Sequence, residues 1–245
     1  MTKASKAINY KPGQYRKKRM SASDWSDAHI KKWTERHGKD AVQKPQELQS
    51  PSICFSRKIG VGALEIADIL APAINFRVID REILEHMAKE TNLTHQTIAF
   101  FDERYPGKMS DFMAMLTKDK SFMKNDYAAQ LAESVLALAA LEPTIFVGRG
   151  AHLILPRERV LAVRFICGLE FRAERLAKEL GIAYQDAEYR LKTIDKEQEK
   201  FFKTVYDKKD ASPYEFDLVI NRDYITDANA AAKIVETAYE QKFKK

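Results

Sequence analysis

Short apolar runs alternate with longer amphipathic stretches from Ile53 to the end of the chain. Short runs rich in apolar and β-branched residues predict strands, whereas apolar residues three and four positions apart predict helices. The runs that predict strands are "ICFS", "FRVID", "TIFV", "VLAVRFIC" and "DLVIN". Strands that alternate with helices at this spacing favour an α/β fold, in which helices cover both faces of a mostly parallel sheet. Ligands of such sheets bind beyond the carboxyl ends of the strands.

The stretches between these strands have the length and periodicity of helices. We predict helices at 63–73, 81–91, 126–141, 168–180, 184–206 and 227–242. The helix at 126–141 is apolar nearly all round and is therefore expected to be buried. Between Leu93 and Lys124 we predict a helical insertion, which Pro106 and Gly107 interrupt.

The first fifty residues differ from the rest in charge. They hold 12 Lys and Arg against 5 Asp and Glu, so their net charge of +7 (12 − 5) exceeds the formal net charge of +6 of the whole chain. We therefore expect a basic, flexible N-terminal extension at 1–50 and one domain at 51–245. Within the extension, Trp25, Ile30 and Trp33 would share one face of a short helix, which would either dock on the domain or stay loose.

The sequence does not have the pattern of a membrane or secreted protein. The longest apolar run begins at Tyr127 and is interrupted by Glu133, Glu142 and Pro143, whereas a membrane-spanning helix needs about 20 mainly apolar residues. The basic stretch at 11–20 is followed by polar residues instead of the apolar core of a signal peptide. We expect a cytoplasmic protein without a membrane partner.

The stretch "SRKIGVGALE", Ser56 to Glu65, follows the first predicted strand and enters a helix. Gly60 and Gly62 would allow backbone amides to converge on an anion at the start of that helix. In the pattern GxxxxGK[ST], however, Ala63 stands in place of the lysine and Leu64 in place of the hydroxyl residue. Two interpretations fit the pattern equally: a phosphate-binding loop, or a tight turn that binds nothing.

Several charged residues lie near the same predicted edge of the sheet. Arg57 and Lys58 would add positive charge to the loop, or would be ordinary solvated residues. Asp80 ends the second strand, where it would contact a ligand or cap the following helix. Arg149 stands between two glycines directly after a buried strand, which suits an arginine aimed into a pocket.

A second pair of arginines lies in the helix at 168–180. Arg172 and Arg175 are three residues apart and so share one face of that helix. They would clamp a phosphoryl group, or form the ion pairs that are common on helix surfaces.

Five segments, taken in order, resemble the cytidylate kinase-like family of P-loop kinases over about Ile53 to Ile234. They are "ICFSRKIGVGALEIADILA", "VIDREILEHMA", "IFVGRGAHLIL", "VRFICGLEFRAERLAKELGI" and "DLVINRDYITDANAAAKI". The resemblance implies a three-layer α/β/α fold with a phosphate-binding loop, a helical insertion that receives the phosphate acceptor, and a helical lid.

The resemblance also implies site residues and cofactors. Ser56, Gly60 and Gly62 match the phosphate loop and Asp80 the acid that ends the second strand. Arg149 matches the arginine of a Gly-Arg-Gly turn, and Arg172 and Arg175 match the arginines that open the lid. ATP and Mg²⁺ are the implied cofactors, with Ser56 and Asp80 as the metal ligands. The chain departs from the family pattern at Val61, at Ala63 and Leu64, and at Gln198 of the lid, where an arginine is expected.

Two functions from different classes follow. The first is ATP-dependent phosphoryl transfer to a nucleoside monophosphate, for which the family resemblance suggests cytidylate. The second is a catalytically weak or inactive kinase fold that binds a nucleotide or another anion and regulates a partner. We favour the enzyme. Nucleic acid would bind only through the basic extension, by way of "YRKKRM" and its neighbouring aromatic residues.

Overall fold

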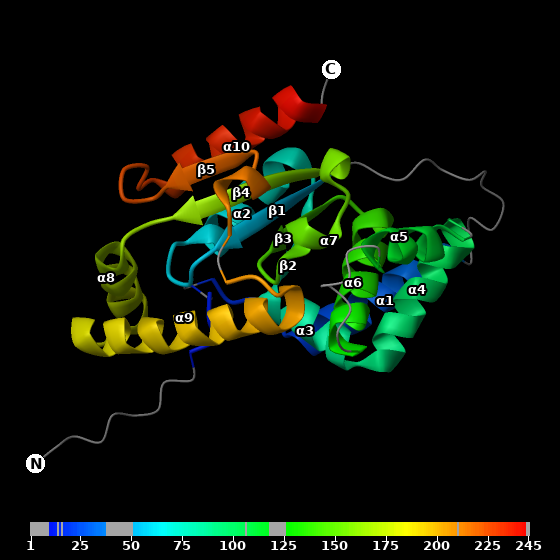
Figure 1. The fold of residues 1–245 in the computed structure, drawn as a ribbon, viewed down its shortest axis with the longest axis horizontal. Coiled ribbons are helices and arrows are strands. Elements are labelled where there is room, and N and C mark those ends of the chain that lie inside the picture. Colours follow the sequence, from blue (N-terminus) through cyan, green and yellow to red (C-terminus); the bar gives the residue numbers. More distant parts are fainter. Residues whose placement is uncertain are drawn as a thin grey trace, which may run out of the picture.

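A parallel sheet forms the centre of the computed structural model, which describes residues 10–13, 15, 17–37, 51–105, 107–117, 126–209 and 211–243 (Figure 1). The strands lie in the order β2-β3-β1-β4-β5, and every neighbouring pair is parallel. Their bounds are Ser52–Arg57 (β1), Arg77–Asp80 (β2), Thr144–Val147 (β3), Val160–Ile166 (β4) and Leu218–Asn221 (β5). The predicted α/β class and parallel sheet are confirmed.

The central strand β1 is buried on both faces. Ile53 and Phe55 face one hydrophobic cluster, whereas Cys54 belongs to the cluster on the opposite face. Because successive side chains of a strand point to opposite faces, a continuous apolar run is what a doubly covered strand requires. The sequence "ICF" has this character.

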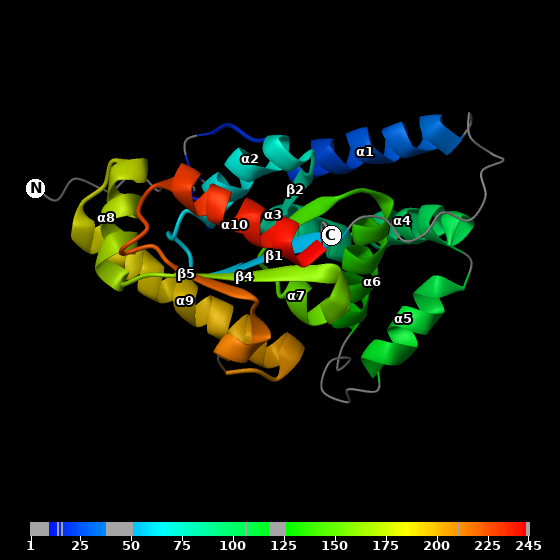
Figure 2. The ribbon, with the colours of Figure 1, turned by 90° about the horizontal axis from the view of Figure 1, so that it is seen from above.

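Helices cover the two faces of the sheet unequally (Figures 1 and 2). One face packs against α2 (Ala63–Ile74) and α10 (Ala228–Phe243). The other face carries a larger set: α1 (Ala22–His37), α3 (Arg81–Lys89), α4 (Thr91–Arg104), α6 (Asp126–Leu141) and the short α7 (Ala151–Ile154). As predicted, α6 is largely buried, with ten buried residues from Ala128 to Leu141.

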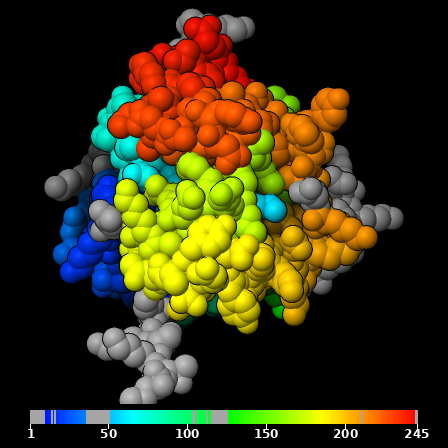
Figure 3. Space-filling view, turned by 90° about the vertical axis from the view of Figure 1, so that its left-hand side faces the viewer, coloured from blue at the N-terminus to red at the C-terminus, as the bar shows by residue number. Residues whose placement is uncertain are grey.

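The predicted insertion and lid are both present as helices. In the insertion, α4 is followed by α5 (Lys108–Thr117), and the helical break falls beside Gly107. Pro106 and residues 118–125 lie outside the described residues. The lid consists of α8 (Leu169–Leu180) and α9 (Tyr184–Tyr206), which pack on each other beyond the carboxyl ends of the strands and fill the centre of the face seen in Figure 3.

The helix α1 is docked on the domain, which is one of the two alternatives that the sequence left open. Trp25 and Trp33 are 8% and 3% exposed and belong to the core beside α3 and α4. The indole of Trp33 also donates a hydrogen bond to Glu142 (3.1 Å). Within the expected extension at 1–50, α1 is therefore the part whose tryptophans complete the core. Residues 38–50, next to the expected domain boundary, lie outside the described residues.

Two short 3₁₀ turns, Arg157–Arg159 and Pro213–Glu215, complete the described elements. Within the described residues, no helix combines the length and the apolar character needed to cross a bilayer.

His152, in α7, is a structural histidine and provides a test of stability against pH. Its Nε2 lies 3.6 Å from Glu215 Oε2, and burial lowers its pKa. The neighbouring His152 ring, and then hydrogen bonds from Lys208 and the Ser212 amide, lower the pKa of Glu215 from 4.5 to about 2. At both groups the folded protein binds fewer protons than the unfolded chain does, so the free energy of unfolding decreases as the pH falls.

We predict that Glu215→Gln removes part of the acid sensitivity of the fold. A lowered carboxyl pKa stabilises the folded state above its unfolded value, and this stabilisation disappears as the pH falls from 4.5 to about 2. The free energy of unfolding of wild type should therefore exceed that of the variant by about 1–2 kcal/mol at pH 7, with solvent screening allowed for. Near pH 2 the two free energies should be almost equal. Urea unfolding across this range measures the difference, with exposed Glu158→Gln as the control. A difference that does not change with pH would contradict the assignment.

Candidate functional site

Arginines from three different elements meet at the carboxyl edge of the sheet. Arg57 ends β1, Arg81 begins α3 directly after β2, and Arg149 lies in the turn after β3. Together with Ser56, Gly148, Gly150, Gln198 and Phe202, they line a hollow with a volume of about 20 Å³. We call it the arginine hollow. In this conformation it has room for about one water molecule.

The backbone of the Gly-Arg-Gly turn holds Arg149 in an unusual conformation. Arg149 has a φ of 53°, in the left-handed region that non-glycine residues rarely adopt. A Cβ on Gly150 would lie 2.6 Å from the ring of Tyr206, so the tyrosine of the lid packs where only glycine fits. The Tyr206 hydroxyl donates a hydrogen bond to the Arg149 carbonyl oxygen. Tyr206 thus fixes the turn by packing and by a hydrogen bond, which keeps Arg149 in its unusual backbone conformation.

The side chain of Arg149 is positioned by contacts from two other helices. Its guanidinium lies 4.0 Å from the ring centroid of Phe201, a cation–π contact with α9. It also forms an ion pair with Glu85 of α3, which accepts a second bond from Arg81 Nε at 2.6 Å. A single carboxylate is therefore shared by two guanidinium groups.

Arg57 is 6% exposed and lies deeper than its place in a loop suggested. Its carbonyl oxygen accepts a hydrogen bond from the Gln198 side chain of the lid (2.8 Å). The Nε atoms of Arg57 and Arg149 are both buried and, among the described residues, have no hydrogen-bond partner. Buried donors left unpaired are costly, and an anion in the hollow would satisfy them.

The electrostatics of the arginine hollow also favour an anion. Burial, together with the neighbouring charges of Arg81 and Arg57, lowers the pKa of Arg149 to about 9. Burial is the main cause that lowers the pKa of Arg57 to about 10, and Arg81 adds to it. Both groups remain protonated at pH 7, so they repel each other in a partly desolvated site. A bound dianion would relieve this repulsion.

The loop and the lid arginines form a separate site next to the arginine hollow. Gly60 and Gly62 have φ values of 89° and 82°, and Gly62 caps the start of α2. A Cβ on Gly62 would lie 3.2 Å from the guanidinium carbon of Arg175. The Arg175 side chain therefore occupies the space directly in front of the loop.

Both lid arginines are paired with carboxylates. Arg172, 3% exposed, contacts Asp195 of α9 at 2.9 Å and donates to the Ile59 carbonyl oxygen of the loop (3.3 Å). Arg175 contacts Glu65 of α2 at 2.7 Å. Their predicted role on a transferring phosphoryl group would need these ion pairs to open.

The two proposed metal ligands are engaged with the protein. Ser56 Oγ accepts a hydrogen bond from Arg164 (2.8 Å). Asp80 Oδ1 caps α3 through the amides of Glu82 and Ile83, so the capping alternative describes this oxygen correctly. Asp80 Oδ2 forms an ion pair with Arg19 at 3.3 Å. Among the described residues, no group of three His, Cys, Asp or Glu side chains gathers to hold a metal.

Lys58 is exposed, in contrast to its neighbour Arg57. The structure therefore brings Ser56, Arg57 and Arg149 together in the arginine hollow. Arg175 lines a second, neighbouring hollow with Gly60 and Gly62, and Lys58 lines neither.

Sequence reasoning did not select Arg81, Gln198, Phe202 or Arg164 as site residues. Arg81 directly follows a strand end and stands four residues before Glu85, which is the only local signal. Gln198 stands out in the sequence only as a departure from the family pattern in the lid. Phe202 and Arg164 reach the site from distant elements, and no spacing in the sequence indicates that approach.

The site and the sheet together define the class of protein. A parallel sheet of this strand order, a glycine-containing loop between β1 and α2, a helical insertion and a lid are the parts of a P-loop kinase fold. A profile of the cytidylate kinase-like family matches residues 52–224, so the chain belongs to the cytidylate kinase-like family. No curated protein matches the chain.

Solved structures that align with this chain have low sequence identity to it. An uncharacterized protein from Eubacterium ventriosum aligns with a TM-score of 0.59 at 19% identity, over 79% of this chain and 99% of that one. Shikimate kinase from Bacteroides thetaiotaomicron aligns with a TM-score of 0.43 at 14% identity, over 78% of this chain and 98% of its own. A gluconokinase from Sinorhizobium meliloti aligns with a TM-score of 0.41 at 15% identity, over 80% of this chain and 99% of its own. The first of these similarities concerns the fold alone, and none of the three identifies a substrate.

Proposed function

We propose that the protein transfers a phosphoryl group from ATP to a small phosphorylated acceptor, a nucleoside monophosphate such as cytidylate. The observation that carries the proposal is the arginine hollow, where Arg57 and Arg149 each keep a buried, unpaired Nε. The planar fork of a guanidinium group binds two oxygens of one phosphate at the same time, which an ammonium group does less well. Ordinary solvated arginines have no reason to be gathered in this way.

Each chemical requirement of the reaction falls to identifiable groups. Arg57, Arg81 and Arg149 would bind phosphate oxygens and stabilise the charge that develops on them. The amides of the loop at the start of α2 would bind the neighbouring phosphates. The lid would exclude water, since Gln198 already reaches the Arg57 carbonyl oxygen.

The chain fits the phosphates of ATP better than it fits the metal. The buried Nε atoms suit phosphate, whereas Asp80 Oδ2 is the oxygen that this site offers to Mg²⁺ once Arg19 has left it. Mg²⁺ commonly uses one or two carboxylates together with water and phosphate oxygens. When bound, it would neutralise part of the charge on the phosphates.

The second candidate, an anion-binding regulatory protein with little turnover, is favoured by a different observation. Arg172 and Arg175 are held by Asp195 and Glu65, and the loop has Ala63 and Leu64 where a lysine and a hydroxyl residue would assist catalysis. This arrangement is compatible with binding a phosphate-bearing ligand without transferring its phosphoryl group.

Titration calorimetry with ATP, with and without MgCl₂, followed by a transfer assay over CMP, dCMP, UMP and AMP, separates the two functions. We expect magnesium-dependent ATP binding and turnover of one monophosphate. Binding of ATP without turnover of any acceptor would favour the regulatory protein. Absence of binding for ATP and for all four monophosphates would contradict the kinase.

A further inference from the structure

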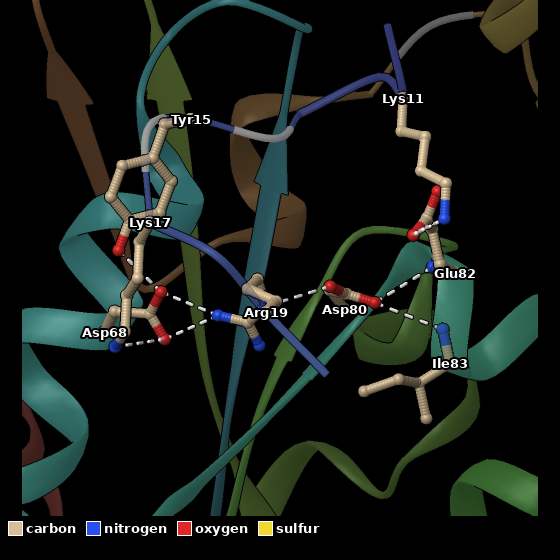
Figure 4. A network of polar contacts seen from close by, with 8 residues as sticks. All are labelled: Lys11, Tyr15, Lys17, Arg19, Asp68, Asp80, Glu82 and Ile83. Carbon is tan, nitrogen blue, oxygen red and sulfur yellow. Dashed lines mark hydrogen bonds and ion pairs between the residues drawn. The ribbon is translucent and has the colours of Figure 1, made fainter. Parts of the chain in front are cut away.

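The part of the N-terminal segment that precedes α1 crosses the mouth of the phosphate loop. We call residues 10–13, 15 and 17–20 the strap. Lys11 forms an ion pair with Glu82 (3.2 Å), and the Tyr15 hydroxyl donates a hydrogen bond to Asp68 (2.6 Å). Asp68 belongs to α2, which follows β1, and Glu82 belongs to the first turn of α3, which follows β2. The strap is therefore attached to two helices (Figure 4).

Arg19 is the main attachment of the strap. Its guanidinium lies between two carboxylates, 2.6 Å from Asp68 and 3.3 Å from Asp80 (Figure 4). These side chains are only 15%, 8% and 11% exposed, respectively. The contact therefore excludes water much better than the Lys11–Glu82 pair does, and it contributes more to holding the strap.

The strap lies directly on Arg57. A Cβ added to Gly13 would be 2.9 Å from Arg57 Nη2, so nothing fits between the strap backbone and this guanidinium. Tyr10 accepts a hydrogen bond from the Gly13 amide and packs beside the cluster that includes Ile59. The strap thus helps to bury an arginine that also lines the arginine hollow.

A second hollow lies between the strap and the loop. Tyr10, Gly13 and Tyr15 line it on one side, and Gly60, Gly62 and Arg175 line it on the other. Its volume is about 20 Å³, which holds one water molecule and no phosphate chain. A ligand cannot contact the loop from this side while the strap is in place.

The strap is held by few contacts compared with the core. Tyr10 and Tyr15 are the strap residues that pack at the edge of the hydrophobic clusters. The contacts of Lys11, Lys17 and Arg19 are polar. Segments held in this way open at a small fraction of the free energy of global unfolding. Phosphates bound to Arg57 would supply a competing interaction of the same kind.

We propose that the strap is an autoinhibitory segment, which must leave Arg57 before a phosphate-bearing ligand can bind. This inference rests on the proposed phosphate-binding function. Its release would have two effects at once, because departure of Arg19 also frees Asp80 Oδ2, the oxygen suited to a metal. Opening of the strap and completion of the site are then the same event.

Gly13→Ala in the full chain tests the proposal. The φ of Gly13 is +97°, so alanine is strained there and its methyl group meets Arg57. The change should lift the strap without altering any residue of the domain. Gly107→Ala is the matched control, since its φ of +76° imposes similar strain but nothing lies within 4 Å of the added carbon.

Two measurements report on the strap independently. Modification by phenylglyoxal, followed by mass spectrometry, should label Arg57 at least several-fold faster in Gly13→Ala than in wild type or Gly107→Ala. Exposed Arg157 serves as the internal standard. Calorimetry with ATP and MgCl₂ should show about tenfold tighter binding in Gly13→Ala, because the binding-competent state no longer has to displace the strap. Tyr15→Phe should change both values in the same direction by less.

The outcomes distinguish the strap from the proposed function. Unchanged labelling of Arg57 in both variants would overturn the autoinhibitory role. Faster labelling with unchanged ATP affinity would also overturn it, because the strap would then cover the arginine without competing for ligand. Faster labelling with no ATP binding in any form would contradict the proposed function, and the strap would lose its role with it.

Discussion

Replacing Arg149 with alanine is expected to lower the rate of phosphoryl transfer by about a thousandfold or more. Arginines that contact the transferred phosphoryl group contribute on the order of 10³ to 10⁵ in rate, because charge develops there in a site shielded from water. Arg149 is the member of the arginine hollow that two helices and a fixed turn aim into it. The transfer assay with the accepted monophosphate measures the change.

The chemical nature of the side chain provides the control for this prediction. Arg149→Lys keeps the charge but loses the planar fork, so we expect it to recover only a small part of the lost rate. Arg157→Ala, which removes an exposed ion pair with Asp217, should leave the rate unchanged. Thermal unfolding of each variant shows whether the fold is intact. A folded Arg149→Ala protein with wild-type turnover would remove Arg149 from the site.

Replacing Trp33 with alanine is expected to destabilise the whole domain by about 3–5 kcal/mol. The indole is 3% exposed, donates a hydrogen bond to Glu142, and lies under the guanidinium of Arg77 at 5.5 Å. Its removal leaves a cavity in the larger of the two clusters around the sheet and takes one hydrogen-bond donor from Glu142, which keeps Lys32 at 3.3 Å. Urea unfolding at neutral pH measures the free energy of unfolding.

Two further variants separate packing from hydrogen bonding at this position. Trp33→Phe keeps most of the apolar surface and should cost about 1–2 kcal/mol, mainly for the lost indole hydrogen bond and the smaller ring. Tyr214→Ala, at a side chain that is 96% exposed, should change stability by less than about 0.5 kcal/mol. If Trp33→Ala is as mild as Tyr214→Ala, then α1 is attached too weakly to count as part of the core.

Hydrophobic periodicity was sufficient to predict most of the fold. The predicted helix at 126–141 has the bounds of α6, because its apolar residues end where Glu142 and Pro143 begin. The helix at 184–206 matches α9, whose charged face and few buried positions still repeat at helical spacing. By contrast, α7 spans only Ala151–Ile154 and is too short to produce a periodic signal.

The candidate site was less predictable than the fold, for a physical reason. Arg57 and Arg149 stand out in the sequence because a strand end and two glycines mark them. The strap gives no such mark, since its basic residues are typical of a solvated tail until Asp68 and Asp80 are seen opposite Arg19. Tertiary contacts of this kind decide the site, and the roles predicted for its residues stay predictions.

The contact between Tyr206 and the Gly-Arg-Gly turn anchors the C-terminal end of α9. Tyr206 is the last residue of the helix, packs against Gly150 and donates a hydrogen bond to the Arg149 carbonyl oxygen. Gln198 lies about 12 Å and Tyr184 about 33 Å from that pivot along the helix axis, at about 1.5 Å per residue. A swing of the lid would therefore move Tyr184 almost three times as far as Gln198, while Arg149 stays almost still. Wide opening at the far end would then need only a small displacement above Arg57.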